Sequence, residues 1–209
     1  MSMDYQEFSR LWSSGHGNAS THGLVGAWLQ ISYRLAKVCT AARITPNLLT
    51  FFGVIAACAT AIYSPHWWIT FPLLISLLCD GIDGSTAIVQ NRSNKLGATL
   101  DAVADRVSEA LWAVAFYRLG APLTWVVALW TVTAFQEYAR ARLGSEGIHE
   151  VGVVTPAERP VRAILLFLAI LVVQFHSKHN WLNEIAIFMT LLQTFSFGLI
   201  LTFARRSLR

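Results

Sequence analysis

Four aspartates lie within the most apolar kind of sequence that this chain contains. Asp80 and Asp83 directly follow the run LLISLLC, and Asp101 and Asp105 lie in the next apolar segment. An ionised Asp at the centre of a membrane helix costs about 2.5–3.5 kcal/mol on insertion scales. Residues three or four apart share one face of a helix. The spacing therefore predicts that each pair presents both carboxylates on one side of its helix.

The segment between the two pairs indicates how they meet. The polar stretch from Asn91 to Asn94 predicts a short turn, which would make the two helices antiparallel neighbours with their carboxylates at one depth. Four carboxylates offer the hard oxygen ligands that Mg²⁺ or Mn²⁺ prefers, and we expect two ions to supply the missing positive charge. Small residues surround the aspartates and leave room for a diphosphate-bearing ligand: Gly81, Gly84, Ser85, Ala87, Gly97, Ala98, Ala102 and Ala104.

Two other interpretations of these residues are possible in a membrane protein. Small residues in membrane helices often serve close packing alone, but this leaves the aspartates unexplained. Carboxylates within membranes also form proton relays or ion pathways. A pathway would spread its charges across the bilayer, whereas these four cluster at one depth.

The composition excludes an ordinary soluble domain. The chain has 209 residues, of which 55% are hydrophobic and 13% charged, and an apolar run of about 20 residues can cross a bilayer as a helix. We predict an all-α polytopic integral membrane protein: residues 1–45 form a cytoplasmic, interfacial amphipathic segment, and residues 46–209 a catalytic domain of six transmembrane helices. The expected spans are 47–63, 67–89, 97–118, 122–143, 160–176 and 181–204.

The first 45 residues contain two stretches with helical periodicity. Apolar residues recur at helical spacing within 5–12 and again within 24–38, where Arg34 and Lys37 lie on other flanks. Both stretches are typical of amphipathic helices in the membrane interface. For the first, packing against the protein's own helices is an equally good interpretation.

Basic residues predict the orientation. Thirteen fall on one side of the six spans: Arg10, Arg34, Lys37, Arg43, Arg92, Lys95, Arg140, Arg142, Arg159, Arg162, Arg205, Arg206 and Arg209. Arg118 and Lys178 fall on the other side, and Arg106 lies within a span. Cytoplasmic loops are enriched in Lys and Arg, so both termini and the aspartates are expected to face the cytoplasm. The net charge of +4 then reflects topology and contact with anionic membrane lipids, and we expect no nucleic-acid partner.

The pattern Asp80-x-x-Asp83-Gly84-x-x-Ala87, followed after nine residues by Gly97-x-x-x-Asp101-x-x-x-Asp105, resembles the signature of the CDP-alcohol phosphotransferases. The six-span layout also fits that family, so the resemblance covers nearly the whole chain. It implies transfer of a phosphatidyl group from CDP-diacylglycerol to an alcohol, with release of CMP.

The resemblance also implies roles for single residues. Asp80, Asp83 and Asp101 would bind metal, and Asp105 would be the general base while also touching metal. Gly84, Ala87, Gly97 and Asn47 would lie near the nucleotide, although Asn47 could equally be a helix-start residue. The family further implies a homodimer, and the plasma membrane is the expected location.

Ile88 departs from the family pattern, which has Arg directly after the Ala. Arg92 or Lys95 could replace the missing charge near the nucleotide. The departure also leaves open a catalytically inactive homologue that retains nucleotide or lipid binding.

Four arginines between the fourth and fifth spans concern the acceptor: Arg140, Arg142, Arg159 and Arg162. Guanidinium groups bind phosphate bidentately, although topology and headgroup contact would also account for them, and Glu158 could pair with one. Tyr138-x-Arg140-x-Arg142 with Glu158-Arg159-x-x-Arg162 resembles the actinobacterial phosphatidylinositol phosphate synthases. A phosphorylated polyol such as inositol phosphate is therefore the expected acceptor, with phosphatidylglycerophosphate or cardiolipin synthesis as alternatives.

Overall fold

The computed structural model describes residues 3–17, 19–148, 155–175 and 181–208, and within these ranges the protein is all-helical. The elements are α1 (Tyr5–Gly15), α2 (Gly23–Ala41), α3 (Pro46–Tyr63), the 3₁₀ turn η1 (Trp67–Ile69), α4 (Thr70–Val89), α5 (Lys95–Leu119), α6 (Leu123–Ser145), α7 (Arg159–Phe175) and α8 (Leu182–Ser207). Residue 176, the expected end of the fifth span, and Lys178 lie outside the described residues.

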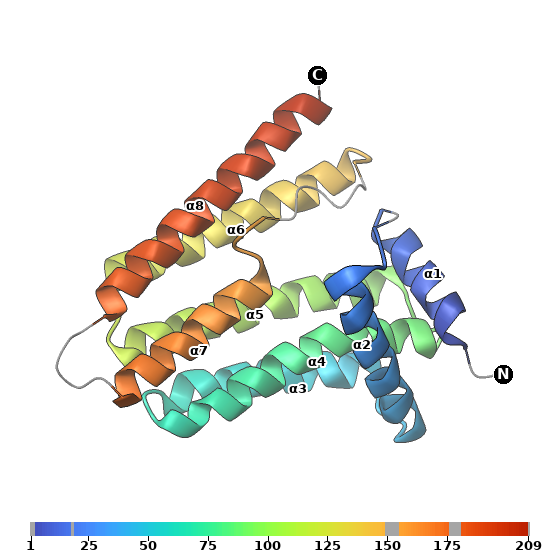
Figure 1. Cartoon of the computed structure of the whole chain (residues 1–209), viewed down its shortest axis with the longest axis horizontal. Helices are drawn as coiled ribbons and strands as arrows, with labels where there is room; N and C mark the ends of the chain where they lie inside the picture. The colour runs from blue at the N-terminus through green and yellow to red at the C-terminus, as the bar shows by residue number, and fades with distance from the viewer. Residues whose placement is uncertain (1–2, 18, 149–154, 176–180, 209) are drawn as a thin grey trace.

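Helices α3 to α8 coincide with the six expected spans to within a few residues at each end. Their ends follow local chemistry. Pro46 occupies the first turn of α3, the Asn94 side chain accepts a 2.8 Å hydrogen bond from the Gly97 amide at the start of α5, and Gly120 ends α5 at φ 112°. Successive helices run in alternating directions, so α4, α6 and α8 end toward the side from which α3, α5 and α7 begin (Figure 1).

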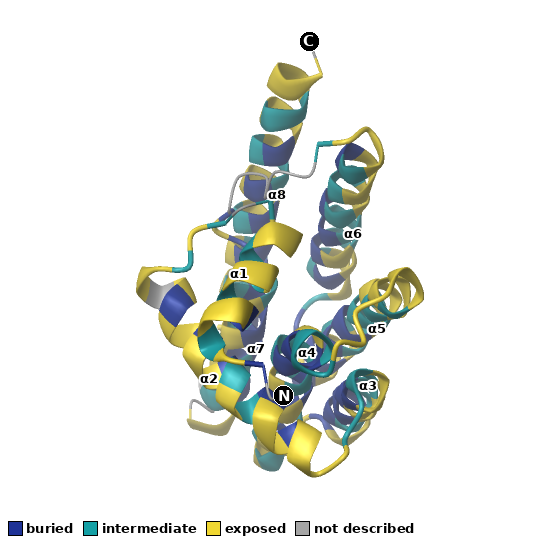
Figure 2. Ribbon diagram, turned by 90° about the vertical axis from the view of Figure 1, so that its right-hand side faces the viewer, coloured by how far each residue is buried: buried dark blue, intermediate teal, exposed yellow. Residues whose placement is uncertain are grey.

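Three of the described helical segments are long and apolar enough to cross a membrane: Pro46–Tyr63, Trp67–Val89 and Leu182–Ser207. Large apolar side chains are nonetheless exposed on all six helices, including Phe51, Phe71, Val103, Phe135 and Phe188. Figure 2 shows the buried residues on the faces where helices meet and exposed residues on the outer faces. Apolar outer faces are those expected of helices surrounded by lipid.

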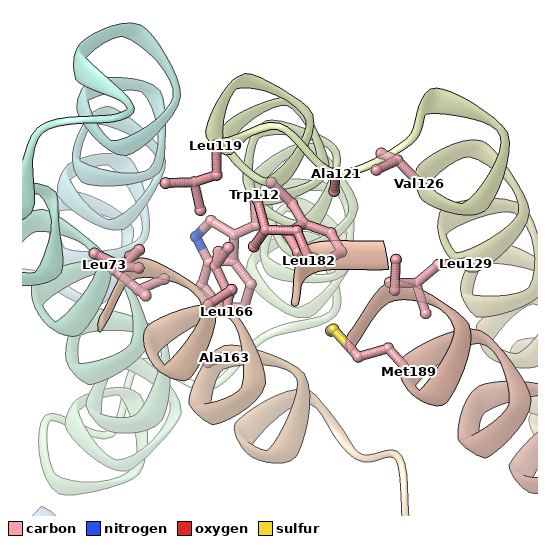
Figure 3. Packing of buried hydrophobic residues seen from close by; sticks show 14 of the residues in the cluster. Leu73, Trp112, Leu119, Ala121, Val126, Leu129, Ala163, Leu166, Leu182 and Met189 are labelled. Atoms are coloured by element: carbon pink, nitrogen blue, oxygen red, sulfur yellow. The ribbon is translucent and has the colours of Figure 1, made fainter. Parts of the chain in front are cut away.

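The main apolar core lies among α4, α5, α6, α7 and the start of α8. Trp112 on α5 packs with Leu73, Leu166 and Leu182 from the other helices (Figure 3). Helix α3 packs extensively against both α4 and α5, and α6 packs against α8. Helices α4 and α5 contact each other less extensively than either contacts α3. The direct pairing of α4 with α5 that the sequence predicted is therefore limited.

Helices α1 and α2 lie across the end of the bundle where α4 ends and α5 begins (Figures 1 and 2). Phe8 of α1 and Leu29 of α2 are fully buried in a cluster that also includes Met3, and Ile88 of α4 packs against it. The apolar side of α1 therefore packs within the protein. Helix α2 keeps Val38 exposed on its outer side.

Candidate functional site

The structure brings the carboxylates of α4 and α5 together. Oxygen atoms of Asp80, Asp101 and Asp105 all lie within 4.8 Å of one another. Asp80 comes from the middle of α4, and the other two come from successive turns of α5. The i, i+4 spacing on α5 and the short turn after α4 together produce this convergence.

Asp83 lies beside this group with different partners. Its Oδ2 accepts a hydrogen bond from Thr50 Oγ1 on α3 at 2.6 Å, and its Oδ1 accepts one from the Gly84 amide at 2.6 Å. The side chain is 3% exposed. Sequence reasoning missed Thr50, since a lone Thr in an apolar helix carries no signal of a partner 33 residues away.

The carboxylate group has the chemistry of a divalent cation site. Asp101 Oδ1 is buried and has no hydrogen-bond partner among the described residues, and a buried oxygen without a donor is costly. A cation held between three carboxylates would satisfy it. Hard oxygen donors are the ligands that Mg²⁺ and Mn²⁺ take, so these residues fit either ion.

A pocket of about 770 Å³ opens beside the carboxylates, within the size range of small-molecule sites. All four aspartates line it, and so do the four positions that the family resemblance assigns to the nucleotide: Asn47, Gly84, Ala87 and Gly97. Leu11, Trp12 and His16 of α1 line it as well, and Trp28 contributes from α2. A Cβ at Gly81 would lie 2.6 Å from the Trp28 ring, so glycine is what lets α2 approach α4 here.

Ile88 and Arg92 occupy the region where the family pattern departs. Ile88 lines the pocket and also packs against the α1–α2 cluster, so an apolar residue at this position joins the N-terminal helices to α4. Arg92 also lines the pocket, whereas Lys95 is not among its lining residues. Of the two candidates for the missing charge, Arg92 therefore has the better position.

Arg159, the first residue of α7, reaches the carboxylates directly. Its Nη1 donates to Asp80 Oδ1 and to Asp105 Oδ1. The guanidinium lies over the Trp112 ring, with Cζ 5.2 Å from the ring centroid, and the side chain is 11% exposed. Both contacts are typical of a buried arginine.

The other three predicted arginines pair with glutamates. Arg140 makes a bidentate pair with Glu158, at 2.5 and 2.9 Å, which confirms that Glu158 pairs with one of them. Burial alone would raise the pKa of Glu158, but the hydrogen bonds from Arg140 and Thr155 hold it below its ordinary value. Arg142 pairs with Glu146 on the exposed end of α6, at 2.8 Å.

Arg162 belongs to a buried ionic network that the sequence reading did not foresee. It donates to Glu109 on α5, and its Nη2 lies 3.8 Å from Glu137 on α6. Arg106 contacts the other oxygen of Glu109 at 2.6 Å. Glu109 is 5% exposed and Arg162 is 7% exposed. A glutamate three residues after a basic residue in an expected span was the only available signal, and it gave no partner on α7.

The large pocket and the arginines meet the carboxylates from different directions. None of Arg140, Arg142, Arg159 and Arg162 lines the large pocket in the part of the chain that the structure describes. A second cavity of about 10 Å³ is bounded by all four aspartates together with Arg159. The carboxylates are thus shared between a roomy pocket under α1 and α2 and a basic region that begins at α7.

The chain is similar to known proteins of one family. Residues 43–196 match the model of the CDP-alcohol phosphatidyltransferase family. The phosphatidylinositol phosphate synthase of Mycolicibacterium smegmatis is 29% identical over 154 residues, covering 68% of this chain and 68% of that protein. The archaetidylinositol phosphate synthase of Aeropyrum pernix is 34% identical over 134 residues, covering 60% and 66%.

Solved structures share the fold. The Mycobacterium tuberculosis phosphatidylinositol phosphate synthase with CDP-DAG bound aligns at a TM-score of 0.64 and 21% identity, covering 84% of this chain and 92% of that one. The same enzyme in complex with manganese and citrate aligns at 0.64 and 21%, covering 83% and 87%. The matched residues 43–196 contain the four aspartates and all of the predicted arginines, which confirms the resemblance seen in the sequence. The chain belongs to the CDP-alcohol phosphatidyltransferase family of enzymes.

Proposed function

We propose that this protein transfers the phosphatidyl group of CDP-diacylglycerol to a phosphorylated polyol, inositol phosphate first among them, and releases CMP. The observation that carries the proposal is the convergence of Asp80, Asp101 and Asp105 between the large pocket and Arg159. The pocket has room for the nucleotide diphosphate, and the arginines offer the charge that a phosphorylated acceptor needs. Relatives that are named for inositol phosphate lipids support the choice of acceptor.

Asp80, Asp83, Asp101 and Asp105 would hold one or two Mg²⁺ or Mn²⁺ ions, which would neutralise the diphosphate and the departing CMP. The acceptor hydroxyl oxygen forms a bond to the phosphorus that carries diacylglycerol, while the bond from that phosphorus to the CMP oxygen breaks. Asp105 takes the hydroxyl proton as general base.

The donor would bind in the large pocket. Gly84, Ala87 and Gly97 leave the backbone open toward the diphosphate, and Asn47 is close enough to the same pocket to contact the nucleotide. Arg92 supplies positive charge at this wall. The lipid chains would leave the pocket toward the apolar outer faces of the helices.

The acceptor phosphate is proposed to bind on the arginine side. Of the four arginines, Arg159 is the one whose described contacts include the aspartates, and it touches two of them. Arg140 on α6 and Arg162 on α7 are each held by a glutamate. Arg142 is the most exposed of the four and would contribute least.

The membrane arrangement is part of the proposal. Helices α3 to α8 would form six spans of a 46–209 catalytic domain, while residues 1–45 lie at the interface. The excess of basic residues where α4 and α6 end supports a cytoplasmic active site and cytoplasmic termini in the plasma membrane. A homodimer is expected as well, with one active site in each copy.

A two-substrate assay tests the proposal. Purified protein in vesicles with CDP-diacylglycerol and Mn²⁺ is offered inositol phosphate, glycerol phosphate, phosphatidylglycerol or free inositol, and CMP and the lipid product are measured. We expect metal-dependent CMP release with inositol phosphate as the preferred acceptor. Arg159→Ala should reduce kcat/KM for the acceptor by about 10–150-fold, the range for a charge-assisted hydrogen bond. Arg205→Ala, on the exposed end of α8, is the matched control and should change it less than about twofold. A preference for free inositol, or equal effects of the two variants, would contradict the assignment.

A further inference from the structure

Arg159 pairs with carboxylates that are also the candidate ligands of a metal ion. Its Nη1 donates to both Asp80 and Asp105, which are two of the three residues whose oxygens could hold a cation. The cavity that the four aspartates and Arg159 enclose is about 10 Å³, roughly the space that one water molecule needs. A cation bound by these carboxylates would therefore lie beside the positively charged guanidinium.

The charge of Arg159 cannot be removed by deprotonation, because a guanidinium stays protonated in proteins. When a divalent cation enters the carboxylate group, the arginine must either remain beside it, with like charges close together, or give up the contact with Asp80 and Asp105. We propose that Arg159 and the divalent metal compete for Asp80 and Asp105, and that metal binding releases the arginine to the acceptor phosphate.

The Arg159 side chain has a hydrogen-bond donor that no described residue uses. Arg159 Nε is buried and has no hydrogen-bond partner among the described residues, so this donor is free for an oxygen of a ligand. The guanidinium also lies over the Trp112 ring, and a small shift across the face of that ring would keep the cation–π contact. Arg159 is the first residue of α7 and directly follows Glu158, the partner of Arg140.

The competition has a functional consequence that rests on the proposed function. Without metal, Arg159 neutralises part of the carboxylate charge and is withheld from the acceptor. With metal bound, the same arginine becomes available as a phosphate ligand, so metal and a phosphorylated acceptor should favour each other's binding. Reciprocity is required for any such coupling.

The test measures metal binding and arginine release with no substrate present, so its result does not depend on the identity of the acceptor. Mn²⁺ affinity is measured by electron paramagnetic resonance of free Mn²⁺ for the wild type, Arg159→Gln and Arg92→Gln. Arg92 is the matched control, because it adds positive charge to the same aspartate-lined pocket and pairs with none of the aspartates in the described contacts. We expect Arg159→Gln to bind Mn²⁺ at least about tenfold more tightly, as for the loss of one charge-assisted contact, and Arg92→Gln less than about threefold.

Release is followed on the wild-type protein, so the test survives a variant that fails to fold. Arg159 is modified with hydroxyphenylglyoxal and the extent is read by mass spectrometry with and without Mn²⁺. We expect its modification to rise several-fold with Mn²⁺, while that of Arg205 and Arg206 stays constant. Unchanged modification of Arg159 would overturn the proposal, as would equal gains of affinity in the two variants or weaker Mn²⁺ binding by Arg159→Gln. If the wild-type protein shows these effects of Mn²⁺ but uses no phosphorylated acceptor in the vesicle assay, that result counts against the proposed function and not against the competition between Arg159 and metal.

Discussion

Two groups of charged residues lie within the helices, and they differ in charge balance. The carboxylate group at the pocket sets four aspartates against one arginine, Arg159, and its formal charge is −3. The network on α5, α6, α7 and the residue before α7 sets Glu109, Glu137 and Glu158 against Arg106, Arg140 and Arg162, and its formal charge is zero.

The difference shows how a binding site can be told from a scaffold in this protein. A buried ion pair is tolerated when each charge has its partner, and removing one partner is far more costly than never having the pair. The balanced network satisfies itself and fixes α7 against α5 and α6. The pocket group remains short of positive charge, which is the property of a site that takes up cations from outside.

The largest effect is expected at the unbalanced group. Asp105→Asn keeps the size of the side chain but removes the proposed general base, and kcat should fall by about 10²–10⁴-fold. Unfolding in detergent should change little, because the group then carries less excess negative charge. Steady-state CMP release and a thermal unfolding curve measure the two quantities. If Asp105→Asn were active but strongly destabilised, the two groups would have exchanged the roles given to them above.

Next in size is the loss of balance in the network. Glu109→Gln leaves Arg162 and Arg106 without their shared carboxylate, and should lower the free energy of unfolding by about 3–5 kcal/mol. The double variant Glu109→Gln/Arg162→Gln should regain part of this loss, since it removes one uncompensated charge. Denaturant unfolding of the two variants provides the comparison. Equal stability of Glu109→Gln and the wild type would show that the network contributes nothing to the scaffold.

Metal binding should stabilise the folded protein through the carboxylate group and not through the network on α5, α6 and α7. At a Mn²⁺ concentration one hundred times the dissociation constant, the folded state should gain about 2.7 kcal/mol, because the ion binds the folded chain. The gain should disappear in Asp101→Asn and persist in Glu137→Gln. Thermal unfolding with Mn²⁺ and with a chelator measures it. Loss of the gain in both variants would mean that the two groups are not independent.

The smallest effect is expected for the pair formed by Arg142 and Glu146. Both side chains are more than half exposed, at 59% and 51%, and exposed pairs typically contribute about 0–1 kcal/mol. Arg142→Ala should therefore leave unfolding within about 1 kcal/mol of the wild type and reduce acceptor use much less than Arg159→Ala. A loss as large as that of Arg159→Ala would place Arg142 at the acceptor phosphate.

The sequence by itself determined the helices and the metal-binding candidates. Apolar runs of sufficient length, with Pro46, Asn94 and Gly120 at their ends, fix where helices begin and stop, because these signals act within one or two turns. The carboxylate convergence was predictable for the same reason. Spacings of three and four residues place Asp80 with Asp83, and Asp101 with Asp105, on common helix faces, and a four-residue turn limits how far apart the two helices can lie.

Only the tertiary structure decided which charges pair. Arg159 meets Asp80 across 79 residues and Glu109 meets Arg162 across 53, so no local rule connects them. The same holds for Thr50 beside Asp83, and for Ile88, which is an apolar contact for α1 rather than a vacant place near the nucleotide. Such pairings depend on the distance and rotation between helices, which packing of the whole apolar core sets. The sequence therefore determines which residues are charged, whereas the fold determines which of these charges are paired.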